Sequence, residues 1–382
     1  MSEFMLKQLG ELVQFSKGKT YSVFSGPTAV PIIGAAEMSG GIPTLFATPH
    51  IPVKLCPDDL IMLWDGERSG LVSTGHAGLV GSTASRLRVN QNIINPKYLY
   101  YHLQQSFDWI QARRTGTGVP HVPSNIGSEL ALTIHTDITE QRRIANVLST
   151  LDEQIQQTEL IILKSNLRAK GLMTDLLSCR QLSRQDVSDV LLSEVIPVVQ
   201  YGISTSLDVE GVIPVLRMNN LSRGEISVLD LKYSPSSVSS NLLLHPGDVL
   251  FNRTNSMEHV GRTSIWRGQL AEATFASYLV RLKPDLSKLL PEYLVYLLEW
   301  EVNQLQMRKY ATPGVQQVNI NPTSLRKCRV CLPNSLVVQR DVVAVLDSSR
   351  EQVSALREEG AKLRLQKQGL MRDLLTGKTR IQ

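Results

Sequence analysis

Two stretches of the chain carry hydrophobic side chains that recur in alternating steps of three and four residues. These steps place the side chains on one stripe of a helix, as in a coiled-coil seam. The first seam consists of Leu148, Leu151, Ile155, Thr158, Ile162, Ser165, Ala169, Leu172 and Leu176, and the second of Leu346, Ser349, Val353, Leu356, Gly360, Leu363, Lys367, Leu370 and Leu374. Gly360 and Lys367 should loosen or bend the second helix. Neither stretch contains proline, so each is predicted to form one helix of roughly 60 Å at 1.5 Å per residue.

The two helices are copies of one segment. Shifting the chain by 198 residues aligns 141–177 with 339–375 without a gap, with 14 of 37 positions identical. GLMTDLL ends the first copy and GLMRDLL the second. Shorter matches lie upstream, between PKYLYYHL and PEYLVYLL and between CPDDLIMLW and HPGDVLFNR. The whole chain is therefore predicted to repeat as module, helix, module, helix.

The repeat predicts four segments: a first module at residues 1–137, a long helix at 138–178, a second module at 179–335 and a C-terminal helix at 336–382. Each module is predicted to be α+β. Its strands include LIMLW, AGLVG and SRLRV in the first copy and DVLFN, RTSIW and YLVRL in the second. A proline then opens a helix that ends near Arg113 or Lys309. Asp137 or Thr139 is suited to cap the first long helix, and Asn334 or Ser335 the second.

Connectivity favours antiparallel pairing of the long helices. The first helix carries the chain from one module to the other, and the second has to run back. This arrangement relates the modules by an approximate twofold axis and makes the helix pair a spacer. The alternative is that each amphipathic helix docks on its own module. A gapless repeat of the seam favours the paired arrangement.

Composition is that of a globular protein, with 42% hydrophobic and 20% charged residues. The net charge of +5 is a mild excess, because residues 1–137 carry 10 basic and 10 acidic side chains and residues 179–335 carry 16 and 14. Any anion-binding surface must then be local. The sequence contains no long apolar run and its start lacks a secretion signal, so we expect a cytoplasmic protein with reduced cysteines and no membrane partner.

Catalytic motifs are absent. Both Gly-Lys-Thr triplets lack the upstream glycine of a phosphate-binding loop, and the histidines show no metal-ligand spacing. Cys328 and Cys331 have the spacing of a redox pair, but packing in a strand is the favoured interpretation. Asn95–Tyr98 superficially resembles a methyltransferase loop and is better explained as a helix cap. We therefore expect no catalytic residue and no metal or cofactor site in this chain.

A basic pair and a glycine-containing turn follow the first helix of each module, in RRTGTGVPHV and RKYATPGVQQV. Glycine admits backbone amides to a phosphate, arginine neutralises it, and histidine or glutamine can bond to base edges. A capped helix end is the plainer alternative for either copy alone. The loop after the central strand is a second candidate surface, and its residues differ strongly between the copies. Differing loops on matching scaffolds would read two different sequences.

These features resemble the specificity subunit of type I restriction-modification enzymes. The resemblance rests on EQRRIANVLSTLDEQI with GLMTDLL, on VQRDVVAVLDSSREQV with GLMRDLLTGKTRI, and on HPGDVLFNRTNS, PEYLVYLL and TPGVQQVNI. It implies two α/β target recognition domains, separated by long antiparallel helices, that read a bipartite asymmetric site in double-stranded DNA. It also implies two methylation subunits that dock on the helices and domains and use S-adenosylmethionine. Two ATP- and Mg-dependent restriction subunits would complete the complex.

The candidate DNA contacts are basic, polar or aromatic residues of these turns and loops. They are Lys17, Lys19, Trp64, Arg68, Ser69, Arg113, Arg114, Thr115, Thr117 and His121 in the first module, and Arg217, Asn219, Arg253, Thr254, Asn255, Lys309, Tyr310, Thr312, Gln316 and Gln317 in the second. The first module has Leu63-Trp64-Asp65 where the second has Asn252-Arg253-Thr254. A non-enzymatic scaffold whose modules bind proteins or other ligands is the alternative function, and duplex binding across a salt series separates the two.

Overall fold

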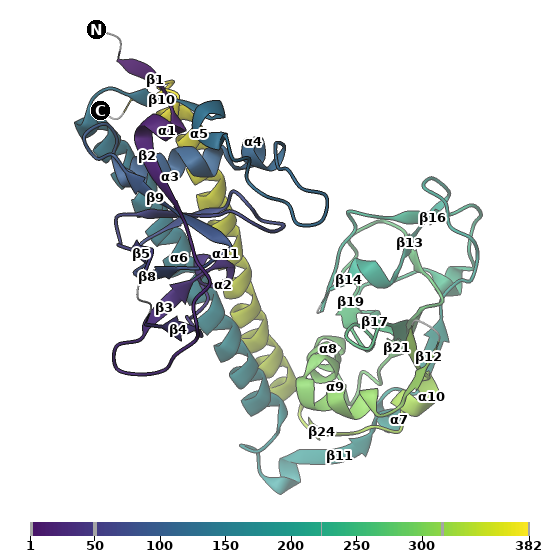
Figure 1. The fold of residues 1–382 in the computed structure, drawn as a ribbon. Helices are drawn as coiled ribbons and strands as arrows, with labels where there is room; N and C mark the ends of the chain where they lie inside the picture. The colour runs from purple at the N-terminus through teal and green to yellow at the C-terminus, as the bar shows by residue number, and fades with distance from the viewer. Residues whose placement is uncertain (1–2, 49–51, 223, 315–316, 381–382) are drawn as a thin grey trace. The chain divides into compact units, whose positions relative to one another are not determined.

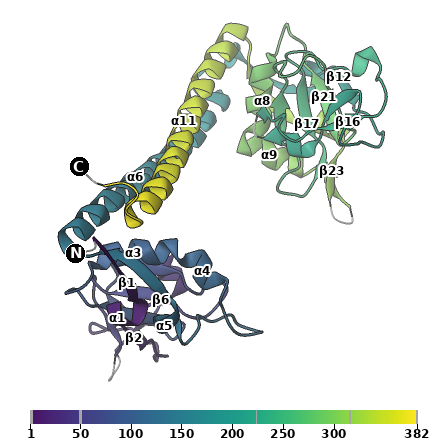
Figure 2. The ribbon, with the colours of Figure 1, turned by 90° about the horizontal axis from the view of Figure 1, so that it is seen from above.

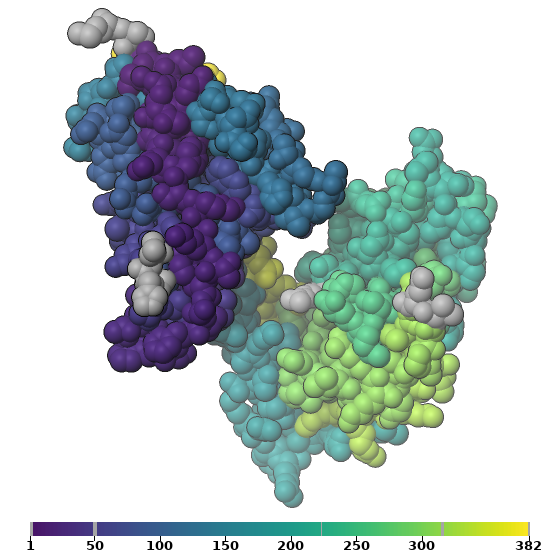
Figure 3. Space-filling view, viewed as in Figure 1, coloured from purple at the N-terminus to yellow at the C-terminus, as the bar shows by residue number. Residues whose placement is uncertain are grey.

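The computed structural model describes residues 3–48, 52–222, 224–314 and 317–380. The chain divides into two compact units, Met1–Leu160 with Arg357–Gln382 and Ile161–Leu356 (Figure 1). Each unit therefore contains one module and part of both long helices. In Figure 3 the N-terminal residues, coloured purple, form much of the visible face of the first unit.

The first module contains ten short strands and five short helices within its described residues. They are β1 (Phe4–Gln8), α1 (Leu9–Leu12), β2 (Val13–Lys17), β3 (Val30–Ile33), α2 (Ala35–Met38), β4 (Phe46–Ala47), β5 (Lys54–Leu55), β6 (Leu60–Leu63), β7 (Val72–Thr74), β8 (Gly78–Val80), β9 (Ala84–Val89), α3 (Pro96–Gln105), α4 (Phe107–Gln111), α5 (Ile126–Glu129) and β10 (Ala131–His135). The strands pair in the orders β2-β9-β6-β7, β4-β3-β8-β5 and β1-β10.

The second module has more short strands than the first, together with short helices and 3-10 turns, within its described residues. They are the 3-10 turn η1 (Arg184–Asp186), β11 (Val187–Leu191), α7 (Leu192–Val195), β12 (Val198–Tyr201), β13 (Ile213–Leu216), η2 (Met218–Asn220), β14 (Leu221–Ser222), β15 (Glu225–Ile226), β16 (Lys232–Ser234), η3 (Ser240–Leu242), β17 (Val249–Asn252), β18 (Thr254–Asn255), β19 (Thr263–Ile265), β20 (Thr274–Phe275), β21 (Leu279–Lys283), α8 (Pro291–Glu299), α9 (Glu301–Arg308), β22 (Ala311–Pro313), β23 (Val318–Ile320), α10 (Pro322–Leu325) and β24 (Arg329–Pro333). Its strand orders are β12-β21-β17-β19, β16-β13-β20, β18-β23-β22, β14-β15 and β11-β24.

Strand register shows that the modules are repeats. In the first sheet β6 pairs antiparallel with β9, and in the second β17 pairs in the same way with β21. Both modules also contain one parallel pair, β3 with β8 and β13 with β20. The predicted α+β class and internal repeat are confirmed.

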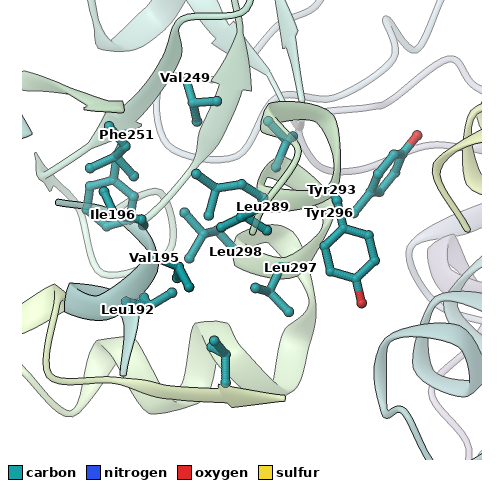
Figure 4. Close-up of a cluster of buried hydrophobic side chains, with 14 of the residues drawn as sticks. Leu192, Val195, Ile196, Val249, Phe251, Leu289, Tyr293, Tyr296, Leu297 and Leu298 are labelled. Carbon is teal, nitrogen blue, oxygen red and sulfur yellow. The ribbon is translucent and has the colours of Figure 1, made fainter. Parts of the chain in front are cut away.

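Hydrophobic runs explain where the cores form. All four residues of β6 and all four of β17 are buried, because these central strands are covered on both faces. Figure 4 shows Val249 and Phe251 of β17 packed with side chains of α7 and α8. Burying each such side chain contributes about 1.5–3 kcal/mol. The central strands therefore have a fixed position relative to the helix that follows.

Both long helices are continuous: α6 runs from Ile138 to Leu177 and α11 from Leu336 to Leu375. They lie side by side and antiparallel (Figures 1 and 2). In the first unit Lys367 Nζ lies 2.6 Å from Asp152 Oδ1, and Arg364 forms an ion pair with Glu159. In the second unit Leu177 shares a core with Leu346. Every predicted seam position is buried or half-buried, so the paired seam is confirmed.

Some local expectations were wrong. The helix after the central strands breaks in each module, at Ser106 between α3 and α4 and at Trp300 between α8 and α9. Trp300 has extended backbone angles, φ −63° and ψ 129°, which interrupt the helical hydrogen bonds. The helix α11 continues through Gly360 and Lys367, so neither residue ends it, and the charge of Lys367 is paired with that of Asp152.

A buried glutamine fixes the start of each long helix to its module. Gln141 and Gln339 are both 0% exposed. The Gln141 side chain accepts from the backbone N–H of Asn95 at 2.7 Å and donates to the carbonyls of Ile93 and His135 at 3.2 and 2.7 Å. Gln339 repeats the arrangement with the N–H of Leu290 and the carbonyls of Lys288 and Pro333. We call each arrangement a glutamine latch.

One of the two capping residues predicted for each long helix accepts a backbone hydrogen bond at the start of that helix. Asp137 Oδ1 accepts from the Thr139 N–H at 2.8 Å at the start of α6. At the start of α11, Ser335 Oγ accepts from the Val338 N–H at 3.5 Å. None of the described helices is both long enough and apolar enough to span a bilayer.

Candidate nucleic-acid interface

In each module the central strand, β6 or β17, ends beside the segment that follows helix α4 or α9 in the sequence. In the first unit the Val122 N–H donates to the carbonyl of Trp64 at 2.9 Å. In the second unit the Ile320 N–H donates to the carbonyl of Arg253 at 2.8 Å. These bonds bring Asp65 opposite His121 and Thr254 opposite Asn319. We call these neighbourhoods the first and second strand-end sites.

The first strand-end site is a charged network. Asp65 Oδ1 lies 2.7 Å from His121 Nδ1, and Asp65 Oδ2 lies 2.7 Å from Lys17 Nζ. The Asp65 side chain is 23% exposed, whereas those of His121 and Lys17 are each 45% exposed. Desolvation raises the pKa of Asp65, but hydrogen bonds from Lys17 and His121 outweigh it and leave the pKa below its ordinary value. The carboxylate is thus ionised and shielded beneath two accessible donors.

The second strand-end site is uncharged at the matching positions. Asn319 Nδ2 donates to Thr254 Oγ1 at 3.2 Å, and the hydroxyl of Thr312 donates to the carbonyl of Asn319 at 3.1 Å. Thr254, Thr312 and Asn319 line a cavity of about 570 Å³ together with Gln317. This cavity leaves room for a base or a phosphate group to approach these side chains.

A cation–π pair lies beside each strand-end site, with its members exchanged. In the first unit Lys17 of β2 lies 5.6 Å from the ring of Trp64, which follows β6. In the second unit the aromatic residue is Tyr201 of β12, and the cation is Arg253 after β17, at 5.1 Å. Lys17 and Tyr201 occupy matching positions, because each faces the β9 or β21 residue at the same register. Both units therefore have a cation–π contact, but the cation lies on β2 in the first unit and directly after β17 in the second.

Other predicted residues of the first module divide into anchored and exposed groups. Arg114 donates to the carbonyls of Glu67 and Gln111, so it ties two loops together. Arg68 donates to Ser39 Oγ at 3.0 Å, and Arg113 stacks on Trp109 at 3.9 Å. Ser69 is fully buried, which removes it as a direct contact. Thr115 pairs with His121 through the backbone, whereas Lys19 and Thr117 are exposed.

In the second module Arg217 and Asn219 are brought together by Asp230, which accepts from them at 2.9 and 3.0 Å. They line a cavity of about 790 Å³ with Asn255, His259 and Arg262. Lys309 and Tyr310 are exposed near the turn. Gln316 lies outside the described residues.

Sequence reasoning missed Asn319, Tyr201, His259 and Arg262. It compared His121 with Gln316 and Gln317, whereas the structure places Asn319 opposite Thr254 as His121 lies opposite Asp65. The signal was present: the offset of 198 residues that aligns the long helices also aligns His121 with Asn319. Within the described residues, no group of three or more His, Cys, Asp or Glu side chains is placed to hold a metal ion.

Comparison with known proteins shows which proteins the chain is similar to. Residues 1–165 match the family described as "Type I restriction modification DNA specificity domain". The chain is 24% identical over 405 aligned residues to the Type I restriction enzyme MjaVIII specificity subunit of Methanocaldococcus jannaschii, covering 98% of this chain and 92% of that one. It is 27% identical over 190 residues to the putative MjaX specificity subunit of that organism, covering 48% of this chain and 44% of the relative.

Solved structures share the fold over nearly the whole chain. The S subunit of a type I restriction-modification system from M. genitalium matches with a TM-score of 0.64 at 15% identity, covering 97% of this chain and 96% of that one. A chain from a study of the assembly and conformational transition of the type I R-M system matches with a TM-score of 0.60 at 17% identity, covering 98% and 97%. The chain therefore has the fold of these S subunits, and its residues 1–165 are similar to the type I restriction modification DNA specificity domain.

Proposed function

We propose that this protein is the non-catalytic DNA-reading subunit of a type I restriction-modification system. Each module reads one half of a bipartite asymmetric site in double-stranded DNA, and the paired long helices set the unread spacer. The observation that carries the proposal is the repeat itself. Two modules with the same strand register present different side chains at matching strand-end sites. Identical readers would favour a symmetric site, whereas these would favour an asymmetric one.

Energetics support reading by a few side chains in each module. A well-formed bidentate contact to a base contributes about 1–3 kcal/mol of discrimination. Exposed cations near the sites, such as Lys19 and Lys309, supply sequence-independent phosphate contacts that weaken as salt rises. Because the modules are nearly neutral, we expect the isolated subunit to bind DNA with modest affinity and its partner subunits to increase that affinity.

Partner subunits would supply the chemistry. The long helices expose large apolar side chains that their mutual seam does not use, including Leu163 and Leu167 of α6 at 57% and 62% and Leu365 of α11 at 68%. Such residues suit docking of two methylation subunits, which also touch the recognition modules. S-adenosylmethionine would bind in those subunits, and ATP and Mg would act in two restriction subunits.

The test is selection of bound duplexes from a random pool by the complex with methylation subunits. Arg253→Ala removes a side chain that is held by the carbonyl of Ser277 and the ring of Tyr201. We expect it to relax one half-site and leave the other unchanged. Lys17→Ala removes the cation of the corresponding cation–π pair in the first unit and should relax the opposite half. Equal weakening of both halves by either variant, or no duplex binding at low salt, would reject the proposal in favour of a scaffold.

A further inference from the structure

Among the differences between the two strand-end sites, one facing pair of positions has a chemical consequence. Asp65 and His121 form the pair in the first unit, and Thr254 and Asn319 form it in the second. Both pairs join the residue after the central strand to the segment that follows α4 or α9. We propose that His121 and Asn319 each read one base pair of their half-site, and that Asp65 and Thr254 select the groups they present. This inference rests on the proposed function.

The second pair presents the pattern that recognises adenine. One N–H of the Asn319 amide is used by Thr254 Oγ1, at 3.2 Å. The amide oxygen and the second N–H remain as an adjacent acceptor and donor. Adenine presents the complementary donor N6–H and acceptor N7 in the major groove, and asparagine bonds to both. Thr254 fixes the amide plane, so it acts as a positioning residue.

The cavity at this position provides the space that such a contact needs. Asn319 is half-buried and shares the wall of the 570 Å³ cavity with Thr254, Thr312 and Gln317. Its backbone is held on both sides, because β23 pairs with β18 and with β22. A side chain on a doubly paired strand has little freedom to leave its orientation. Preorganisation of this kind favours discrimination between bases over general affinity.

The first pair presents a different pattern. The ionised Asp65 carboxylate has only acceptors, so Nδ1 of His121 carries the hydrogen that joins them. A single ring nitrogen, Nε2, is left for the base. One nitrogen cannot reproduce the donor and acceptor pair of an amide. The half-site read by the first unit therefore differs from adenine at the position matched to Asn319.

Substitutions in the second unit test the positioning role. Thr254→Val retains the branched shape but removes the oxygen that accepts from Asn319, and Thr254→Ser restores an oxygen. In the complex with methylation subunits, we expect Asn319→Ala to reduce the preference for adenine at one position by about 5- to 150-fold, which is 1–3 kcal/mol converted to a ratio. Thr254→Val should reduce the same preference, and Thr254→Ser should rescue it. The first half-site is the internal control.

A transfer experiment tests the chemistry directly. The double variant Asp65→Thr with His121→Asn places the second pair in the first unit. We expect selection from random duplexes to show a new adenine preference at one position of the first half-site, with the second half-site unchanged. Thermal unfolding of each variant establishes that it is folded, and the undisturbed half-site shows that it still binds.

The outcomes separate this inference from the proposed function. A wild-type complex that selects no bipartite sequence would overturn the function itself. A wild-type complex that selects one, with Asn319→Ala and Thr254→Val variants that retain the same motif, would overturn only the assignment of these residues. Loss of preference at a base other than adenine would overturn the assigned amide contact.

Discussion

The glutamine latch provides the sharpest prediction about stability. Replacing Gln141 with Met keeps the length of the side chain but removes its hydrogen bonds, leaving the N–H of Asn95 and the carbonyls of Ile93 and His135 without this partner. His135 is buried, so its carbonyl costs about 1–3 kcal/mol when unsatisfied. Asn95 and Ile93 are half-buried and can recruit water, so each loses about 0.5–1.5 kcal/mol. The sum is roughly 2–6 kcal/mol, a large part of the 5–15 kcal/mol typical of a domain.

Hydrogen exchange measured by mass spectrometry resolves where the loss occurs. Gln141→Met should speed exchange in α3 and the first turns of α6, and Gln339→Met should do the same in α8 and the first turns of α11. Gln156→Met is the control, because Gln156 lies on α6 and is exposed. If Gln141→Met lowers the unfolding free energy no more than the control does, the latch has no structural role and this reasoning fails.

Three further predictions concern other buried groups and the helices. Arg281 is 1% exposed and lies 2.7 Å from Asp248, so Arg281→Met should cost about 3–5 kcal/mol in urea unfolding, and pairing it with Asp248→Leu should recover part of the loss. Burial lowers the pKa of His102 to about 3, below the 6.5 of the unfolded chain, so protons favour the unfolded state as pH falls. Between pH 7 and 5 the free energy of unfolding should fall by about 2 kcal/mol more in the wild type than in His102→Leu, a difference whose absence would contradict neutral burial. Removing seven residues from the middle of α6 and from the facing part of α11 should change the preferred DNA spacer in a random-duplex selection and leave both half-site sequences intact.

The repeat and the long helices could be predicted because their signals are local or periodic. A seam of three and four residues requires only the geometry of one helix, and a gapless offset requires no structure. The glutamines that form the latches were visible as identical residues at 141 and 339. Their role was not, because each contacts a loop about 50 residues upstream.

Candidate contacts were harder to predict because a side chain's partners decide its role. Arg114 and Lys19 look equivalent as basic residues near glycines. Arg114 is occupied by two backbone carbonyls, whereas the Lys19 side chain is exposed. Ser69 resembles a polar loop contact but lies fully buried. The helix breaks at Ser106 and Trp300 were missed for a similar reason, since neither residue is a strong helix breaker by its own propensity.

The two modules show how one scaffold can hold different side chains at its strand ends at little structural cost. The latch, the central strand and the register are the same in both units, and these contacts carry the burial energy. The strand-end residues contribute few buried contacts, so exchanging Asp65 and His121 for threonine and asparagine changes hydrogen-bonding pattern and charge without disturbing the core. The exchanged cation–π pair, Lys17 with Trp64 against Tyr201 with Arg253, shows the same tolerance. Under the proposed function, selection for a new half-site is expected to change strand-end side chains while the latches stay fixed, because a change at Gln141 or Gln339 would weaken the module fold on which recognition of any sequence depends.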